Sequence, residues 1–301
     1  MSQTFDIRHV TTYHYAAPMS FARCNLRLRP IAWDGQTLIS HKLITEPGGT
    51  IGTAAARGGL FTLDRLLVSR AVQTLAIISE ARVSVARDVP PLLPSDLTIA
   101  EVAARARRSL DITNQSPARF LYPSLMIDQD GDIAAWARPT LHPDRPALAA
   151  ALDLAQLIAR TFRFDPDATK TETLPAQAFA ARAGVCQDFA HIMISALRAA
   201  GLPAAYASGY IRTIPPPGQE RLQGADAMHG WVLLWSGDPD TMGGRGWIGL
   251  DPTNGILMAS DHILVAAGRD YQDIAPIDGV FTGSGAQDVQ VEVDVVPVGA
   301  S

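Results

Sequence analysis

Cys186 stands at a point of the sequence where a thiol can act as a nucleophile. It lies in the run GVCQDFAH, two residues after Gly184 and directly before an apolar helical pattern. Gly184 favours a break in the chain, so Cys186 is expected in the first turn of a helix, where unpaired N–H groups and the helix dipole favour an anion. Asp188 opposes this effect, because its negative charge lies in the same turn. Without a basic partner, a buried structural cysteine is therefore the better interpretation.

His229 and Asp251 supply such a partner. They flank two β-rich runs, HGWVLLW and WIGLD, which are joined by the turn-rich SGDPDTMGGRG. If the runs form an antiparallel hairpin centred near residue 240, His229 lies opposite Asp251, and Trp231 lies opposite Gly249. Directly opposed residues project from the same face, with Cβ atoms about 5 Å apart. A carboxylate in this place fixes the tautomer of the imidazole and stabilises the imidazolium.

The three residues together predict acyl transfer by a Cys–His–Asp triad. Cys186 would attack a carbonyl carbon as a thiolate, His229 would pass a proton to the leaving amine, and Asp251 would hold the ring. Water or an amine would then resolve the acyl-thioester. The backbone N–H of Cys186 is the expected oxyanion-hole donor, with Gln187 as a second candidate. Trp231, on the strand of His229, is expected to form core and a wall of the substrate groove.

Three segments of different composition have to position this triad. Residues 1–92 alternate polar and apolar side chains, with many β-branched and aromatic residues, which predicts a β-rich domain with Cys24 as a core thiol. Residues 93–145 are expected to form a helical linker region that begins at the capping box TIAE. Residues 146–301 hold helices first and strands afterwards, an order typical of α+β folds, and they are the predicted catalytic core.

The composition excludes several classes of protein. The 301-residue chain has a formal net charge of −5, which argues against a general nucleic-acid binder. Its two cysteines cannot build a disulfide framework, and no CxxC spacing predicts a zinc site. No apolar run approaches the length of a membrane span, and the N-terminus lacks a signal pattern. We therefore expect a soluble, cytoplasmic protein that acts on a peptide or protein substrate, without metal, cofactor, membrane or nucleic-acid partner.

The same residues resemble a known family. GVCQDFAH, GLPAAYASGYI, MHGWV and GWIGLDPTNG are similar to the core motifs of the transglutaminase-like superfamily, in particular its bacterial transglutaminase-like cysteine peptidase branch. RHVTTYHYAAPMSFARCNLRLRP resembles the β-rich N-terminal domain that accompanies this core. The resemblance covers nearly the whole chain. It implies a papain-like fold in which Cys186, His229 and Asp251 form the triad.

The chain departs from the family pattern at several places. Gly230 follows the histidine where the family usually has alanine, VLLW replaces a VEVW-like run, and residues 49–70 lack an FGN-like signature. This last difference leaves the strand pairing over residues 48–90 open. Val185 and Gln187 flank the cysteine in place of the Gln-Cys-Trp arrangement of animal transglutaminases, and no D-x-D-x-D loop supports their calcium requirement. We therefore predict amide hydrolysis rather than protein cross-linking.

Two other functions stay open on the sequence. The same triad can pass its acyl group to an amine, as a transferase or a ligase-like enzyme does. A protein that keeps the fold can also be a catalytically silent peptide-binding scaffold. The segment 214–227, IPPPGQERLQGADA, leads directly to His229. It is expected either to border the substrate groove as a lid or to be an ordinary surface crossover.

Overall fold

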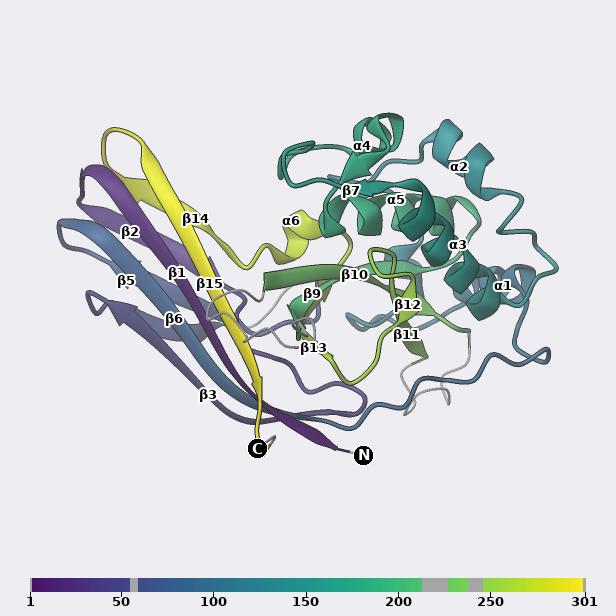
Figure 1. Cartoon of the computed structure of the whole chain (residues 1–301), viewed down its shortest axis with the longest axis horizontal. Helices are drawn as coiled ribbons and strands as arrows, with labels where there is room; N and C mark the ends of the chain where they lie inside the picture. The colour runs from purple at the N-terminus through teal and green to yellow at the C-terminus, as the bar shows by residue number, and fades with distance from the viewer. Residues whose placement is uncertain (1, 55–58, 213–226, 238–245, 300–301) are drawn as a thin grey trace, which may run out of the picture.

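The computed structural model combines two N-terminal β-sheets with a third sheet that helices cover. It describes residues 2–54, 59–212, 227–237 and 246–299. Figure 1 shows the long strands of the first two sheets on one side of the molecule and the helices around the third sheet on the other. The predicted α+β fold with a β-rich N-terminal region is confirmed.

The two N-terminal sheets pack against each other as a sandwich. Burial alternates along their strands, as in β1, where Phe5, Ile7, His9 and Thr11 are buried. Side chains from both sheets, such as Met19 and Leu66, form the core between them. The strand order is β15 (Gln287–Pro297), β1 (Gln3–Met19), β6 (Val72–Val85), β3 (Gln36–Glu46) in the first sheet and β14 (Ile277–Thr282), β2 (Phe21–Leu26), β5 (Leu63–Val68), β4 (Thr50–Ala54) in the second.

Strands β14 and β15 pair with strands of the two N-terminal sheets. The prediction assigned all of residues 146–301 to the catalytic core, but β15 pairs with β1 from Phe5–Pro297 to Tyr15–Gln287. β14 likewise pairs with β2 and closes one edge of the second sheet. An alternating pattern predicts a strand without naming its partner, which here lies at the opposite end of the chain.

The third sheet carries the strand of His229 at its centre. Helix α5 packs on one face of this antiparallel sheet, while Trp33 and Phe120 pack with Trp231 in the cluster on the other face. A short parallel pair, β7 (Arg163–Phe164) and β8 (Ala183–Gly184), leads into α5. The strand order of the third sheet is β12 (Ile256–Leu257), β11 (Trp247–Asp251), β10 (Ala227–Trp235), β9 (Ala204–Ile211), β13 (His262–Gly268).

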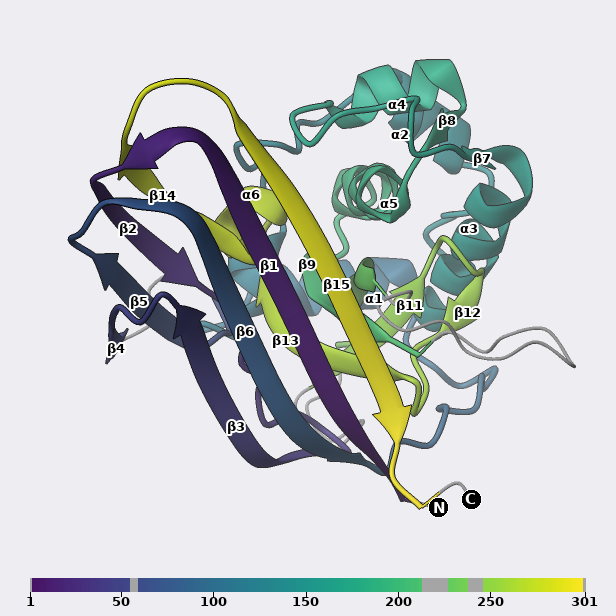
Figure 2. The same ribbon diagram turned by 60° about the vertical axis from the view of Figure 1, so that its left-hand side comes forward.

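Helix α5 (Cys186–Ala199) is the central helix, and Figure 2 shows it end-on. It contacts α2, α3, α4 and β10, so almost every side chain from Gln187 to Arg198 is buried. Each large apolar side chain on it contributes about 1.5–3 kcal/mol by this burial. Gly201, with φ of 80°, follows its last turn. The helices around it and at the edges are α1 (Ile99–Arg107), η1 (Pro117–Phe120), α2 (Gly131–Ala137), α3 (Ala147–Thr161), α4 (Pro175–Ala181) and α6 (Tyr271–Ile274).

The C-terminal end of α5 is fixed by Arg198, which is buried. Its guanidinium donates hydrogen bonds to the backbone carbonyls of Phe120, Tyr122, Ala204 and Arg269. A buried charge with so many acceptors ties the helix to three separate segments of the chain. The N-terminal end of α5, where Cys186 lies, is therefore presented on a rigid element.

Candidate active site

The hairpin of β10 and β11 has a different register from the predicted one. Gly249 pairs with Leu233 instead of Trp231, so the pairing is shifted by two residues and His229 does not lie directly opposite Asp251. Because side chains alternate with a period of two, the shift keeps both residues on the predicted face. The sequence could not locate the hairpin turn within a long Gly-rich loop, and that loop lies largely outside the described residues.

Cys186 is the first residue of α5 and is partly exposed. The Val185 N–H before it donates to Asp188 Oδ2 at 2.8 Å, and Thr169 Oγ1 donates to the same oxygen at 2.6 Å. Gly184 leaves room for this carboxylate, because a Cβ there would lie 2.5 Å from Asp188 Oδ2. Burial raises the pKa of Asp188, and its hydrogen bonds partly offset this. The carboxylate is thus engaged in holding the turn that contains Cys186.

The imidazole of His229 interacts with both Cys186 and Asp251. Its Nε2 lies 2.8 Å from Asp251 Oδ2, and the ring lines one cavity with Cys186, whose side chain interacts with it electrostatically. Since Nε2 faces the carboxylate, Nδ1 is the nitrogen left for the sulfur. Burial alone would lower the pKa of His229, but the interactions with Asp251 and Cys186 outweigh it and raise the pKa. The site therefore favours the imidazolium form of His229.

Asp251 is fully buried at the end of β11, and donors surround its carboxylate. Oδ1 accepts the backbone N–H groups of Thr253 and Asn254 at 2.9 and 3.2 Å. Oδ2 accepts from Asn254 Nδ2 at 2.6 Å in addition to His229. Burial would raise the pKa of Asp251, but hydrogen bonds from His229 and His262 lower it strongly. The DPTN turn thus holds an ionised carboxylate in one orientation.

His262 contacts the same carboxylate oxygen and was not predicted from the sequence. Its Nε2 lies 3.2 Å from Asp251 Oδ2, and its Nδ1 accepts the Ala259 N–H at 3.4 Å. Arg87 donates to the carbonyls of Ala259 and His262 at 3.0 and 2.9 Å and so holds this turn. No spacing in the sequence marks His262 as a partner of Asp251, because the pairing of β13 with β9 brings it there.

His229, Asp251 and His262 also offer three potential metal ligands within 4.8 Å of one another. A zinc ion held at about 2.1 Å by each ligand would separate Nε2 from Oδ2 to roughly 3.4 Å at a tetrahedral angle. The observed contact between His229 and Asp251 is 2.8 Å. This distance fits a hydrogen bond better than a shared cation, so we assign these residues to a hydrogen-bonded network.

A cavity of about 320 Å³ opens beside Cys186 and His229. Tyr206, Met228 and Tyr271 belong to its inner wall, from the core that carries the triad. The opposite wall comes from strands β1 and β15 of the first N-terminal sheet, which contribute His9, Thr11, Tyr13, Val289 and Val291. The N-terminal sheet, including the C-terminal strand β15, is therefore part of this site.

The two weaker site predictions, Gln187 and Trp231, have different outcomes. Gln187 lines the cavity, but its Nε2 donates to the Thr171 carbonyl at 2.8 Å. Trp231 is 0% exposed and stacks beneath the His229 ring, with centroids 6.0 Å apart. It forms core and not a groove wall, because its face of the sheet is covered by other chain segments. The segment predicted as a lid, 214–227, lies outside the described residues up to residue 226.

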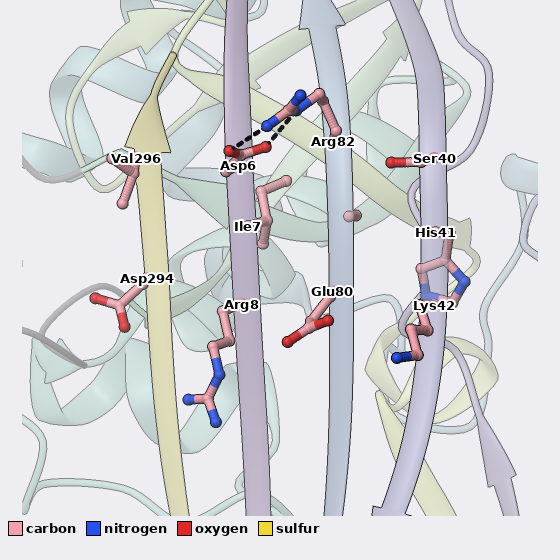
Figure 3. Close-up of a pocket in the computed structure, with 11 residues that line it drawn as sticks. Asp6, Ile7, Arg8, Ser40, His41, Lys42, Glu80, Arg82, Asp294 and Val296 are labelled. Atoms are coloured by element: carbon pink, nitrogen blue, oxygen red, sulfur yellow. Dashed lines mark hydrogen bonds and ion pairs between the residues drawn. The ribbon is translucent and has the colours of Figure 1, made fainter.

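A separate hollow of about 520 Å³ lies on the outward face of the first N-terminal sheet (Figure 3). Asp6 and Arg82 form an ion pair across it at 2.6 Å. Opposite charges on neighbouring strands contribute roughly 0.2–1 kcal/mol per pair, so this hollow fits a structural role in the sheet. The next row alternates in charge across four paired strands, in the order Asp294, Arg8, Glu80, Lys42.

Two buried histidines, His9 and His191, and the partly buried His41 predict that acid destabilises the fold. Burial lowers the pKa of His9, His41 and His191 to about 4 in each case. Between their ordinary pKa of 6.5 and 4, the unfolded chain binds protons that the native protein does not, so the free energy of unfolding decreases as the pH falls through this window. The raised pKa of His229 adds nothing here, because this residue is protonated in both states below 6.5. Urea denaturation at several pH values measures the slope.

A matched pair of variants tests whether the buried histidines cause this decrease in the free energy of unfolding. His9→Gln removes one buried imidazole and should make the decrease with falling pH smaller. His142→Gln, at a histidine whose side chain is 62% exposed, should leave it unchanged. A free energy of unfolding that stays constant between about pH 7 and pH 5 would contradict the prediction.

Comparisons with known proteins agree with the motifs. A model of the transglutaminase-like superfamily matches residues 134–252, which include Cys186, His229 and Asp251. A model of the bacterial transglutaminase-like N-terminal region matches residues 5–84. Strands β14 and β15 lie outside both matches.

Several relatives extend these matches. An uncharacterized protein of Mycobacterium tuberculosis is 33% identical over 298 residues, which cover 97% of this chain and 92% of the relative. A protein-glutamine gamma-glutamyltransferase of Pseudomonas aeruginosa is 33% identical over 115 residues, or 37% of this chain and 16% of that protein. The crystal structure of a candidate cysteine protease from Cytophaga hutchinsonii shares the fold, with a TM-score of 0.75 at 20% identity over 100% of this chain and 92% of that one. In the described part of this chain, no helix has the length and apolar character needed to cross a membrane.

Proposed function

Because the chain belongs to the transglutaminase-like superfamily, we propose that it is a thiol-dependent enzyme that hydrolyses a peptide or isopeptide-like amide through an acyl-thioester. The observation that carries the proposal is the arrangement of three side chains: Cys186 and His229 line one cavity, and His229 Nε2 lies 2.8 Å from Asp251 Oδ2. A nucleophile, a base and an orienting carboxylate in this order form the arrangement that acyl transfer requires. The family and the shared fold support an enzyme of this superfamily.

Acylation begins with the thiolate–imidazolium pair. Cys186 Sγ forms a bond to the carbonyl carbon, and the C=O electron pair moves onto oxygen, where the Cys186 backbone N–H at the start of α5 donates to it. The C=O bond then re-forms, and the C–N bond breaks. The leaving amine takes the proton from His229 Nδ1, while Asp251 holds Nε2.

Deacylation reverses these roles. His229, now neutral, takes a proton from water as the water oxygen attacks the thioester carbon. The C–S bond breaks, Cys186 leaves as a thiolate, and the acid product departs. Each cycle thus consumes one amide and one water and returns the thiolate–imidazolium pair.

Amine transfer is the second candidate. The gamma-glutamyltransferase relative supports it, although the match covers 16% of that protein. In this reaction a primary amine replaces water in deacylation. Incubation with an acyl donor and a primary amine separates the two functions, because the amine adduct exceeds the acid product only for a transferase. The peptide partner and the cytoplasmic location expected from the sequence stay predictions.

Selective alkylation tests the proposed nucleophile. Iodoacetamide near neutral pH should modify Cys186 much faster than Cys24, because burial and the charge of Asp278 raise the pKa of Cys24. Peptide mass mapping over time gives both rates. His229→Ala should remove the fast phase, and Cys24→Ala should retain it. Equal rates at the two cysteines of the parent protein would refute the proposal.

A further inference from the structure

The hydroxyl of Tyr206 occupies the place that a side chain at residue 230 would take. A Cβ built on Gly230 would lie 2.3 Å from Tyr206 Oη and 2.9 Å from its Cζ. On the paired strands β9 and β10, Ser208 lies opposite Gly230 and Tyr206 opposite Val232, so the Tyr206 ring leans along the sheet toward the residue that follows His229. The glycine that departs from the family pattern thus makes room for a phenol hydroxyl.

This hydroxyl lies beside the reacting groups. Tyr206 is 3% exposed and lines the cavity together with Cys186 and His229, so the small accessible part of its side chain faces the cavity. The rings of His191 and Tyr271 pack around it, with centroid distances of 5.0 and 6.2 Å. No hydrogen bond to the Tyr206 hydroxyl is found among the described residues. A donor that faces a cavity and has no protein acceptor can bind an acceptor on a ligand.

The hydroxyl keeps its proton in the working pH range and is therefore able to donate a hydrogen bond. Burial raises the pKa of Tyr206 well above 10, and the electrostatic effects of Cys186 and Asp188 raise it further. The phenol therefore stays protonated while Cys186 is a thiolate.

On the basis of the proposed function, we propose that the Tyr206 hydroxyl is the second donor of the oxyanion hole, together with the backbone N–H of Cys186. When Sγ bonds to the carbonyl carbon, the electron pair that moves onto oxygen accepts the Tyr206 O–H hydrogen bond, and the phenol keeps its proton. When the C=O bond re-forms, the hydrogen bond weakens and the leaving amine takes its proton from His229. Gln187 is the weaker candidate, because one N–H of its amide is bound to the Thr171 carbonyl.

Tyr206→Phe removes only the donor. With p-nitrophenyl acetate as the acyl donor, we expect the acylation rate and kcat to fall about 10²-fold, the typical cost of one oxyanion-hole donor, with KM little changed. Alkylation of Cys186 by iodoacetamide displaces iodide without forming an oxyanion, so its rate and pH dependence should stay at the parent values. Fast alkylation of the parent supports the proposed function independently of this result. If the parent alkylates fast and the variant keeps its kcat, the inference about Tyr206 alone fails.

Tyr210→Phe is the matched control. It removes a buried hydroxyl on the same strand, one that bonds His9 Nδ1 at 3.1 Å and does not itself line the cavity. We expect this variant to lose stability and keep kcat within a few-fold. If Tyr206→Phe and Tyr210→Phe lose kcat equally, the Tyr206 hydroxyl acts only through packing, and the proposal fails. If Tyr206→Phe also lowers the rate of Cys186 alkylation by the same factor as kcat, the hydroxyl acts on the Cys186 sulfur and not on the oxyanion. This result would also overturn the proposal.

Discussion

Cys186→Ala should keep its fold and lose acyl transfer by about 10⁴-fold or more. Among the described residues that line the cavity there is no second thiol, so no other strong nucleophile can form the acyl-thioester. The side chain is partly exposed at the first position of α5, and its truncation removes few buried contacts. Turnover of p-nitrophenyl acetate and thermal unfolding measure the two properties separately.

Cys24→Ala is the control for this prediction. Cys24 packs against the core of the N-terminal sandwich and does not line the cavity, so its replacement should lower stability slightly and leave turnover unchanged. Full activity of Cys186→Ala would contradict the triad. If the parent shows no turnover and Cys186→Ala still binds peptide normally, the scaffold alternative is the better interpretation.

Asp251→Asn should lower kcat by about 10⁴-fold, the magnitude known for the corresponding change in serine protease triads. The carboxylate accepts from His229 and His262 at once, and an amide that presents its N–H₂ to either ring forces that ring into the wrong tautomer. Asp251→Ala removes the acceptor altogether and should lower the free energy of unfolding by about 3–5 kcal/mol. Steady-state kinetics and urea denaturation test these two expectations.

The pH dependence of the Asp251 effect follows from its lowered pKa. A carboxyl group of this kind contributes stability above its ordinary pKa of 3.8 and loses it as the pH falls further. The stability difference between Asp251→Asn and the parent should therefore stay constant from about pH 5 to pH 6, which lies below the ordinary pKa of His229, whose raised pKa also depends on Asp251. A difference that decreases within this range would show that the carboxylate is not held ionised.

Asp64→Asn separates catalysis from stability. Asp64 is 2% exposed in the N-terminal sandwich, where Thr53 and Arg29 donate to its carboxylate. Its amide variant should lose stability through the same loss of buried charge-assisted bonds and keep kcat. If Asp64→Asn and Asp251→Asn lose kcat equally, the Asp251 effect is one of folding.

The sequence by itself determined the local features of the site. Gly184 and the apolar stripe after Cys186 predict a helix that starts at the thiol, and this is where α5 begins. Alternation in HGWVLLW and WIGLD predicts strands whose phase places His229 and Asp251 on one face. The predicted register of the β10–β11 hairpin was wrong, but the predicted face was not affected, because a shift of two residues keeps every side chain on its face.

Only the tertiary structure decided which residues far apart in the sequence contact one another. It brings His262 to Asp251, sets the Tyr206 hydroxyl beside Gly230, and adds β15 to the wall of the cavity. Each of these contacts depends on which strands pair and how two sheets pack. Periodicity reports the face that a residue occupies within its own element, but the choice of partner depends on the burial and hydrogen bonding of the whole chain at once.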